Sequence, residues 1–172
     1  DGDEVVVSSK SETSGLVGNL YTWAQITGFD SEEDNGPGSI NGTGFQIGAD
    51  MAVGTDMVAG LSLGYSDINA SDEGFSQDGT LTYLQPYFSY RSGAWQGNAS
   101  LIFGQGDYDQ TSEGGAGTGE TDLFAFTFEG GYDMALQNGL IATPMVGLIA
   151  GSEDVTGISG TLADAGTESY DF

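Results

Sequence analysis

Large apolar residues alternate with small or polar residues through residues 44–65, GFQIGADMAVGTDMVAGLSLGY, with one break at 54–56. Phe45 and Ile47 fall on one side of this pattern, and Gln46 falls on the other. Successive side chains of a β-strand point to opposite faces, so a period of two predicts strands with one apolar and one polar face. An amphipathic helix would instead need apolar residues every three or four positions.

The same alternation recurs along most of the chain. It predicts strands at about 17–29, 40–53, 57–68, 80–91, 95–107, 121–135 and 140–151, and residues 167–172 begin another. Most of these segments exceed the ~5–6 residues that are usual for strands in soluble sheets. Their lengths match or exceed the ~9–11 residues with which a tilted strand crosses a bilayer. The alternation does not orient the first segment.

The connections between the expected strands alternate between short turns and long loops. Short turns are expected at 54–56, 92–94 and 137–139, and the last contains Asn-Gly, a strong hairpin signal. Long loops are expected at 31–39, 69–79, 107–120 and 152–166. Outer-membrane β-barrels have short periplasmic turns and longer external loops in this order.

The two faces of the expected strands differ in chemistry. In a barrel, the bulky apolar face contacts lipid and the small, polar face lines the lumen. The residues predicted to face lipid are Phe45, Ile47, Met51, Leu61, Leu63, Leu101, Phe103, Phe124, Phe126 and Phe128. Those predicted to face the lumen are Gln46, Asp50, Ser62, Gln85, Arg91, Gln96, Asn98, Glu129 and Asp133.

Aromatic residues gather near the ends of the expected strands. Tyr90, Trp95 and Tyr132 lie near short turns, whereas Tyr65, Phe103 and Tyr108 lie near long loops. Amphipathic rings favour the two membrane interfaces, where they form girdles around barrels. General enrichment of aromatic residues in strands is the alternative interpretation, and the positions favour girdles.

The charge and composition exclude several classes of protein. The chain of 172 residues has a net charge of −24, which repels nucleic-acid phosphates, so no nucleic-acid partner is expected. The absence of His and Cys excludes a Ser-His triad, a thiol nucleophile, a disulfide and a His- or Cys-based zinc site. No run of about eighteen apolar residues occurs, so no transmembrane helix is expected.

Short motifs give no catalytic or metal site. Residues 114–120, GGAGTGE, lack the Lys-Ser/Thr of a phosphate-binding loop and are expected to form an external loop. Asp67, Asn69 and Ser71 have the spacing of a calcium loop, but Asp72 stands where such a loop needs glycine. With Lys10 and Arg91 as the only basic residues, the carboxylates of the lumen are expected to lack counter-ions and to favour cations.

The order of several motifs resembles the β-barrel of autotransporters, the translocators of type V secretion. Trp23 and Gln25 are followed by GFQIGAD, a short turn, and VAGLSLGYSDIN, and later by TYLQPYFSYRSGAW, LFAFTFEGGYDMAL and NGLIATPMVGL. The resemblance covers about 17–172 and implies a twelve-stranded outer-membrane barrel that exports a passenger. Two departures are visible: only seven or eight strands are expected here, and no basic luminal helix is recognisable in the first fifteen residues.

We therefore expect an all-β, antiparallel up-and-down transmembrane β-barrel, at least partly present, over 16–172, preceded by an acidic and polar segment, 1–15. Its expected location is the bacterial outer membrane. The expected partners are lipid, lipopolysaccharide, the barrel-assembly machinery and a passenger domain, with no cofactor and no enzymatic activity. An eight-stranded barrel closed by 161–172 is the alternative to an incomplete larger one. A small stand-alone barrel (structural, adhesive or porin-like) and a soluble acidic β-protein, for example a two-sheet sandwich, are the alternative functions.

Overall fold

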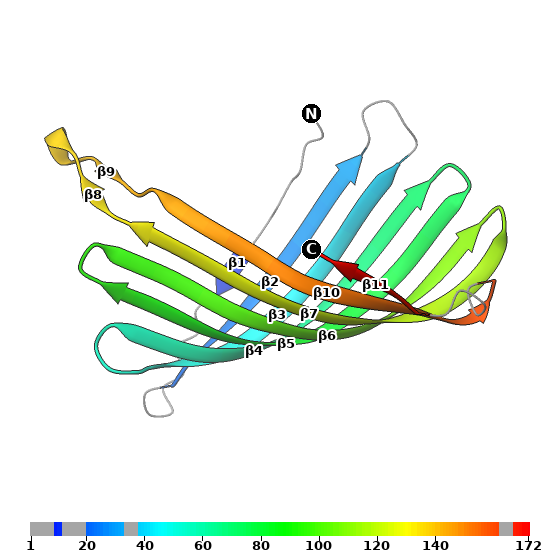
Figure 1. The fold of residues 1–172 in the computed structure, drawn as a ribbon, viewed down its shortest axis with the longest axis horizontal. Coiled ribbons are helices and arrows are strands. Elements are labelled where there is room, and N and C mark those ends of the chain that lie inside the picture. Colours follow the sequence, from blue (N-terminus) through cyan, green and yellow to red (C-terminus); the bar gives the residue numbers. More distant parts are fainter. Residues whose placement is uncertain (1–8, 12–19, 33–37, 162–166) are drawn as a thin grey trace.

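The computed structural model describes residues 9–11, 20–32, 38–161 and 167–172. Nine strands form one antiparallel sheet in the order β1-β2-β3-β4-β5-β6-β7-β10-β11, which is a single curved layer (Figure 1). They are β1 (Ser9–Ser11), β2 (Leu20–Glu32), β3 (Ser39–Ala52), β4 (Met57–Asp72), β5 (Phe75–Ser92), β6 (Trp95–Ser112), β7 (Gly115–Tyr132), β10 (Met145–Gly160) and β11 (Thr167–Asp171). β8 (Met134–Ala135) and β9 (Ile141–Ala142) form a small separate hairpin around the 3-10 turn η1 (Gln137–Gly139).

The strands form where the alternation predicts them. β2 to β7 and β10 correspond to the seven expected segments, and β11 corresponds to 167–172. Each strand of the nine-stranded sheet pairs with the next strand of that sheet along the chain, which confirms the up-and-down topology. The three-residue β1 was not predicted. Within the described ranges, no helix has the length and apolar character needed to cross a membrane.

The expected long loops at 69–79 and 107–120 are wrong. β4 and β5 extend to Asp72 and Phe75, and β6 and β7 extend to Ser112 and Gly115, so that both connections are two-residue turns. β10 likewise continues to Gly160 through most of the expected loop 152–166. Polar residues on both faces look like loop in the sequence, but they do not prevent the backbone from continuing its ladder of hydrogen bonds.

Glycine supplies the backbone conformation at these unexpected turns. Gly74 has a φ of 73° and Gly115 a φ of 130°, values that residues with a side chain rarely adopt.

Residues 33–37, 162–166 and most of the expected 1–15 segment lie outside the described residues.

The expected strands 121–135 and 140–151 are each interrupted. β7 ends at Tyr132 and β10 begins only at Met145, with β8 and β9 between them. Pro144 cannot donate a backbone hydrogen bond, although its carbonyl accepts one from the Tyr132 N–H at 3.2 Å. The short turn expected at 137–139 is present, with Gly139 at a φ of 77°.

The sheet is open in the part of the chain that the structure describes. β1 and β11 stand at its two ends, and the pairings found among the described residues do not join them. All extensive contacts are between neighbouring strands, so the described residues place no second layer on either face. Ala125, which is 4 % exposed, is the single buried hydrophobic residue among them, and the fold therefore has no conventional core.

Candidate functional site

The apolar face carries the ten residues predicted to face lipid. Residues directly opposite one another in an antiparallel pair share a face, and the register places all ten together. One row across five strands consists of Ile47, Leu63, Leu84, Phe103 and Phe124. Nine of the ten are exposed, by between 37 % and 51 %, and Phe126 is intermediate. This face is thus a continuous apolar surface that the described part of the chain leaves uncovered.

Aromatic side chains cluster on this apolar face near the β5–β6 turn. The rings of Trp95 and Tyr132 meet edge to face with their centroids 4.8 Å apart. They line a shallow apolar groove together with Phe88 and Tyr90. Tyr108, which was predicted to join the opposite girdle, lies on the polar face instead, because it pairs with Gly79 and Gly119.

The polar face is the more enclosed of the two. All described residues that are buried lie on it, namely Gly42, Ser62, Gly64, Ser100, Gly104, Gly117, Gly119, Ala125 and Gly131. The register places eight of the nine predicted lumen residues on this face, from Gln46 in β3 to Glu129 in β7. The ninth, Asp133, follows β7 and contacts Arg91 of the same face.

A row of hydrogen bonds crosses five strands on the polar face. The Nε2 atom of Gln46 in β3 donates to Ser62 Oγ in β4 and to Gln85 Oε1 in β5, both at 2.6 Å. Gln85 Nε2 donates to Ser100 Oγ in β6 at 2.9 Å. The hydroxyl of Ser100 lies 2.7 Å from that of Thr127 in β7. Because each link joins a different strand, this row, the Gln46–Thr127 row, ties the middle of the sheet together.

A second cluster joins β2, β3 and β5. Trp23 Nε1 donates to the Tyr87 hydroxyl at 2.7 Å, and that hydroxyl donates to Asp50 Oδ2 at 2.7 Å. The ring of Trp23 lies over its cross-strand partner Gly48, where an added Cβ would come within 2.5 Å of the indole. The position of Trp23 over Gly48 shows that its indole lies on the polar face. This contact assigns the two faces of β2, which the sequence pattern could not do.

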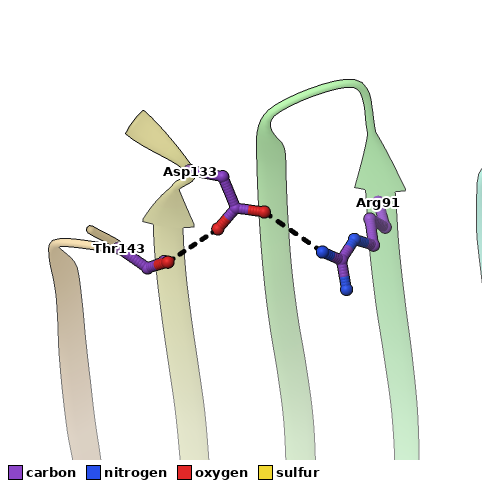
Figure 2. Close-up of polar contacts among 3 residues, drawn as sticks. All are labelled: Arg91, Asp133 and Thr143. Atoms are coloured by element: carbon purple, nitrogen blue, oxygen red, sulfur yellow. Dashed lines mark hydrogen bonds and ion pairs between the residues drawn. The ribbon is translucent and has the colours of Figure 1, made fainter. Parts of the chain in front are cut away.

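An ion pair stands at the turn end of the same face. Arg91 in β5 donates to Asp133 Oδ2 at 3.1 Å, and Thr143 donates to Asp133 Oδ1 at 2.8 Å (Figure 2). The Arg91 side chain is 70 % exposed and that of Asp133 is 23 % exposed. The expectation that the carboxylates of this face lack counter-ions is therefore wrong for Asp133.

The family comparison agrees with this geometry. Residues 20–170 match the family model of the autotransporter β-domain. The chain belongs to the autotransporter β-domain family. Neither the curated proteins nor the solved structures gave a match to it.

The location and activity of this autotransporter β-domain follow from its family. Domains of the family are β-barrels of the bacterial outer membrane that act as translocators, and the family is not a catalytic one. They work with the barrel-assembly machinery and carry passenger domains. The match therefore favours the translocator over the stand-alone barrel and the soluble β-protein.

The motifs weighed as possible binding sites have a structural role in this autotransporter β-domain. Residues 115–120 of the glycine-rich motif form part of β7, so the expected external loop is wrong there. Asp67, Asn69 and Ser71 are all in β4, and the Asn69 amide donates to the Asp67 carboxylate at 3.1 Å. Among the described residues, no group of three or more carboxylates is placed to hold a metal ion.

Sequence reasoning missed how the large residues of the polar face are accommodated. Tyr83 and Tyr87 each stand directly opposite a glycine, Gly64 and Gly60, and cover it with the ring. The sequence contains these tyrosines and glycines, but which tyrosine pairs with which glycine can be found only when the register of the strands is known.

Proposed function

We propose that this autotransporter β-domain contacts outer-membrane lipid with its apolar face and lines a passenger-conducting lumen with its polar face. The separation of the two faces carries the proposal. The apolar face exposes large side chains such as Ile47 and Phe103, while the polar face holds the enclosed Gln46–Thr127 row. Exposing such a side chain to water costs roughly 1.5–3 kcal/mol relative to burying it, and lipid removes that cost.

The polar face suits a lumen wall because its buried polar groups are all hydrogen-bonded. No buried side-chain nitrogen or oxygen of the described residues lacks a hydrogen-bond partner. A wall whose polar groups are mutually bonded presents few fixed sites to an unfolded chain moving past it. This property supports passage of a passenger rather than its tight binding.

Toward the Gly74 and Gly115 turns, beyond its large apolar residues, the apolar face becomes acidic. Three pairs of carboxylates stand directly opposite one another on neighbouring strands, namely Asp122 and Asp154, Asp107 and Glu120, and Asp78 and Asp109. We infer that this acidic surface lies at the level of the lipopolysaccharide headgroups. Divalent cations from the medium would bridge its carboxylates to the lipopolysaccharide phosphates.

Two lysine substitutions test the assignment of the faces. Leu101→Lys places a charge on the apolar face, where it costs about 2–4 kcal/mol at the bilayer midplane. Asn98→Lys is the matched control on the polar face, because Asn98 is exposed and stands opposite Glu129. In cells that produce the full-length gene product, we expect the first variant to lose heat-modifiable, outer-membrane protein and surface display of the passenger.

The second variant should retain both properties. Equal assembly of the two variants would contradict the assignment of the faces. If Asn98→Lys assembled normally but displayed no passenger, the face assignment would stand and the proposed route of the passenger would fall.

A further inference from the structure

A cavity of about 510 Å³ lies on the polar face, toward the end of the strands that carries the Gly74 and Gly115 turns. Its lining comes from β4, β5, β6, β7, β10 and β11. Its volume is within the range of pockets that hold small organic ligands, roughly 300–1,000 Å³. Neither the Gln46–Thr127 row nor the Trp23 cluster contributes to it, so the proposed function does not account for this cavity.

Apolar side chains and two phenol rings shape the cavity. Ile68, Leu81 and Val155 supply aliphatic surface, and Tyr108 and Tyr170 supply the rings. The Tyr108 ring lies across its cross-strand partner on β7, Gly119, where an added Cβ would come within 2.3 Å of the ring. The Tyr108 ring thus covers Gly119 and also lines the cavity.

Two carboxylates of the polar face, those of Glu153 and Glu168, line the cavity beside the rings. The third acidic lining residue, Asp107, belongs to the apolar face, where it stands opposite Glu120. Glu153 accepts a hydrogen bond from the Thr121 hydroxyl at 2.8 Å, and Glu168 accepts one from the Tyr170 hydroxyl at 2.5 Å. Glu153 stands opposite Tyr170 in the ladder between β10 and β11. The ladder thus places both acids against the same tyrosine.

The negative charge of the cavity is not balanced by a basic residue among its described lining residues. None of its described lining residues is Lys or Arg. Arg91 lies at the opposite end of β5, where it is paired with Asp133. A ligand that neutralised Glu153 and Glu168 would therefore have to bring its own positive charge.

We propose that this cavity binds a small organic ammonium cation. A cation is attracted both by the carboxylates and by the faces of the tyrosine rings, and its carbon substituents would contact Ile68, Leu81 and Val155. A bare metal ion fits less well, because the described residues include no cluster of three metal-ligating side chains. The proposal does not depend on which face of the sheet lines the lumen.

Choline and 3,3-dimethylbutan-1-ol test the proposal, since the alcohol has the same shape as choline without its charge. The protein folded in detergent micelles would be titrated with each compound by isothermal calorimetry at constant ionic strength. We expect saturable choline binding at least about tenfold tighter than that of the alcohol. Equal binding of the two compounds, or no binding of choline, would overturn the proposal.

Variants locate the site. Glu168→Gln and Glu153→Gln keep an acceptor for the Tyr170 and Thr121 hydroxyls, and each should weaken choline binding about fivefold or more. Glu129→Gln is the control, because it removes the same charge from the same face outside the cavity. Heat-modifiable migration shows that each variant is folded. Equal weakening by Glu129→Gln would show that only overall charge attracts choline, and it would overturn the site.

Discussion

The phenol ring of Tyr87 in β5 lies directly over Gly60, its partner in β4. A Cβ at Gly60 would come within 2.2 Å of the ring, so any larger residue there must displace it. Displacement would break the hydrogen bonds that the Tyr87 hydroxyl makes with Trp23 and Asp50. The glycine therefore maintains a contact that joins β2, β3 and β5 across β4.

Replacement of Gly60 with alanine should destabilise the folded protein. We expect a loss of about 1–3 kcal/mol, which is the usual cost of overpacking, measured by urea unfolding of protein folded in detergent. Gly79→Ala is the matched control on the same face, because its nearest contact to an added Cβ is 3.7 Å away. Equal destabilisation by the two variants would rule out the Tyr87 ring as the cause.

The Gln46–Thr127 row should contribute more stability than an exposed polar pair on the same face. Ser62 is 2 % exposed and hydrogen-bonded to Gln46, whereas Ser89 bonds Asn98 in an exposed position. We expect Ser62→Ala to lower the free energy of unfolding by about 1–2 kcal/mol. Ser89→Ala should lower it by less than about 0.5 kcal/mol, and the reverse order would contradict a stabilising role for the row.

The strands and their faces could be predicted from the sequence because both follow from the period of two. Leu61 and Leu63 are apolar because one face meets an apolar environment, and Ser62 and Gly64 are small because the other face is enclosed. That pattern is local, so it survives without knowledge of the partner strand. The strand ends beyond the large apolar residues carry no such pattern. For this reason residues 69–79 were expected to form a loop.

The contacts of the polar face could not be predicted because they depend on register. Arg91 and Asp133 are 42 residues apart in sequence, and they meet because the Asp133 N–H bonds the Ala94 carbonyl of the β5–β6 turn at 2.8 Å. Likewise, Trp23 covers Gly48 only in the observed pairing of β2 with β3. Register is set by turn lengths, and two of the expected turn lengths were wrong.

The turn between β5 and β6 should tolerate asparagine at Gly93 better than valine. Gly93 has a φ of 58°, and an added Cβ would meet nothing within 4 Å, so only the backbone conformation opposes substitution. Gly93→Val should cost about 1–2 kcal/mol of folding stability, because left-handed geometry is unfavourable for L residues. Gly93→Asn should cost less, since asparagine tolerates that geometry; equal urea midpoints for the two variants would contradict this account.

Divalent cations should stabilise the acidic part of the apolar face, where three pairs of carboxylates stand opposite one another. Like charges directly opposite one another in a ladder are destabilising by about 0.2–1 kcal/mol for each pair. About 10 mM Mg²⁺ should therefore raise the urea midpoint of the folded protein, and chelation should lower it. Asp109→Asn removes one facing pair with Asp78 and should reduce this dependence. Asp56→Asn, in the β3–β4 turn, should leave the dependence unchanged; an unchanged response in Asp109→Asn would exclude the pair as its source.

A pore lined by the polar face should prefer cations. On the polar face, Asp50 and Glu129 carry negative charge, and Arg91 is already paired with Asp133. The fixed charge along this face is therefore negative, and it raises the local concentration of cations. In planar-bilayer recordings with a potassium chloride gradient, the reversal potential should lie closer to the equilibrium potential of potassium than to that of chloride. Arg91→Gln should shift this potential further in the same direction and Glu129→Gln should shift it back, whereas preference for chloride in the unmodified protein would contradict a lumen lined by this face.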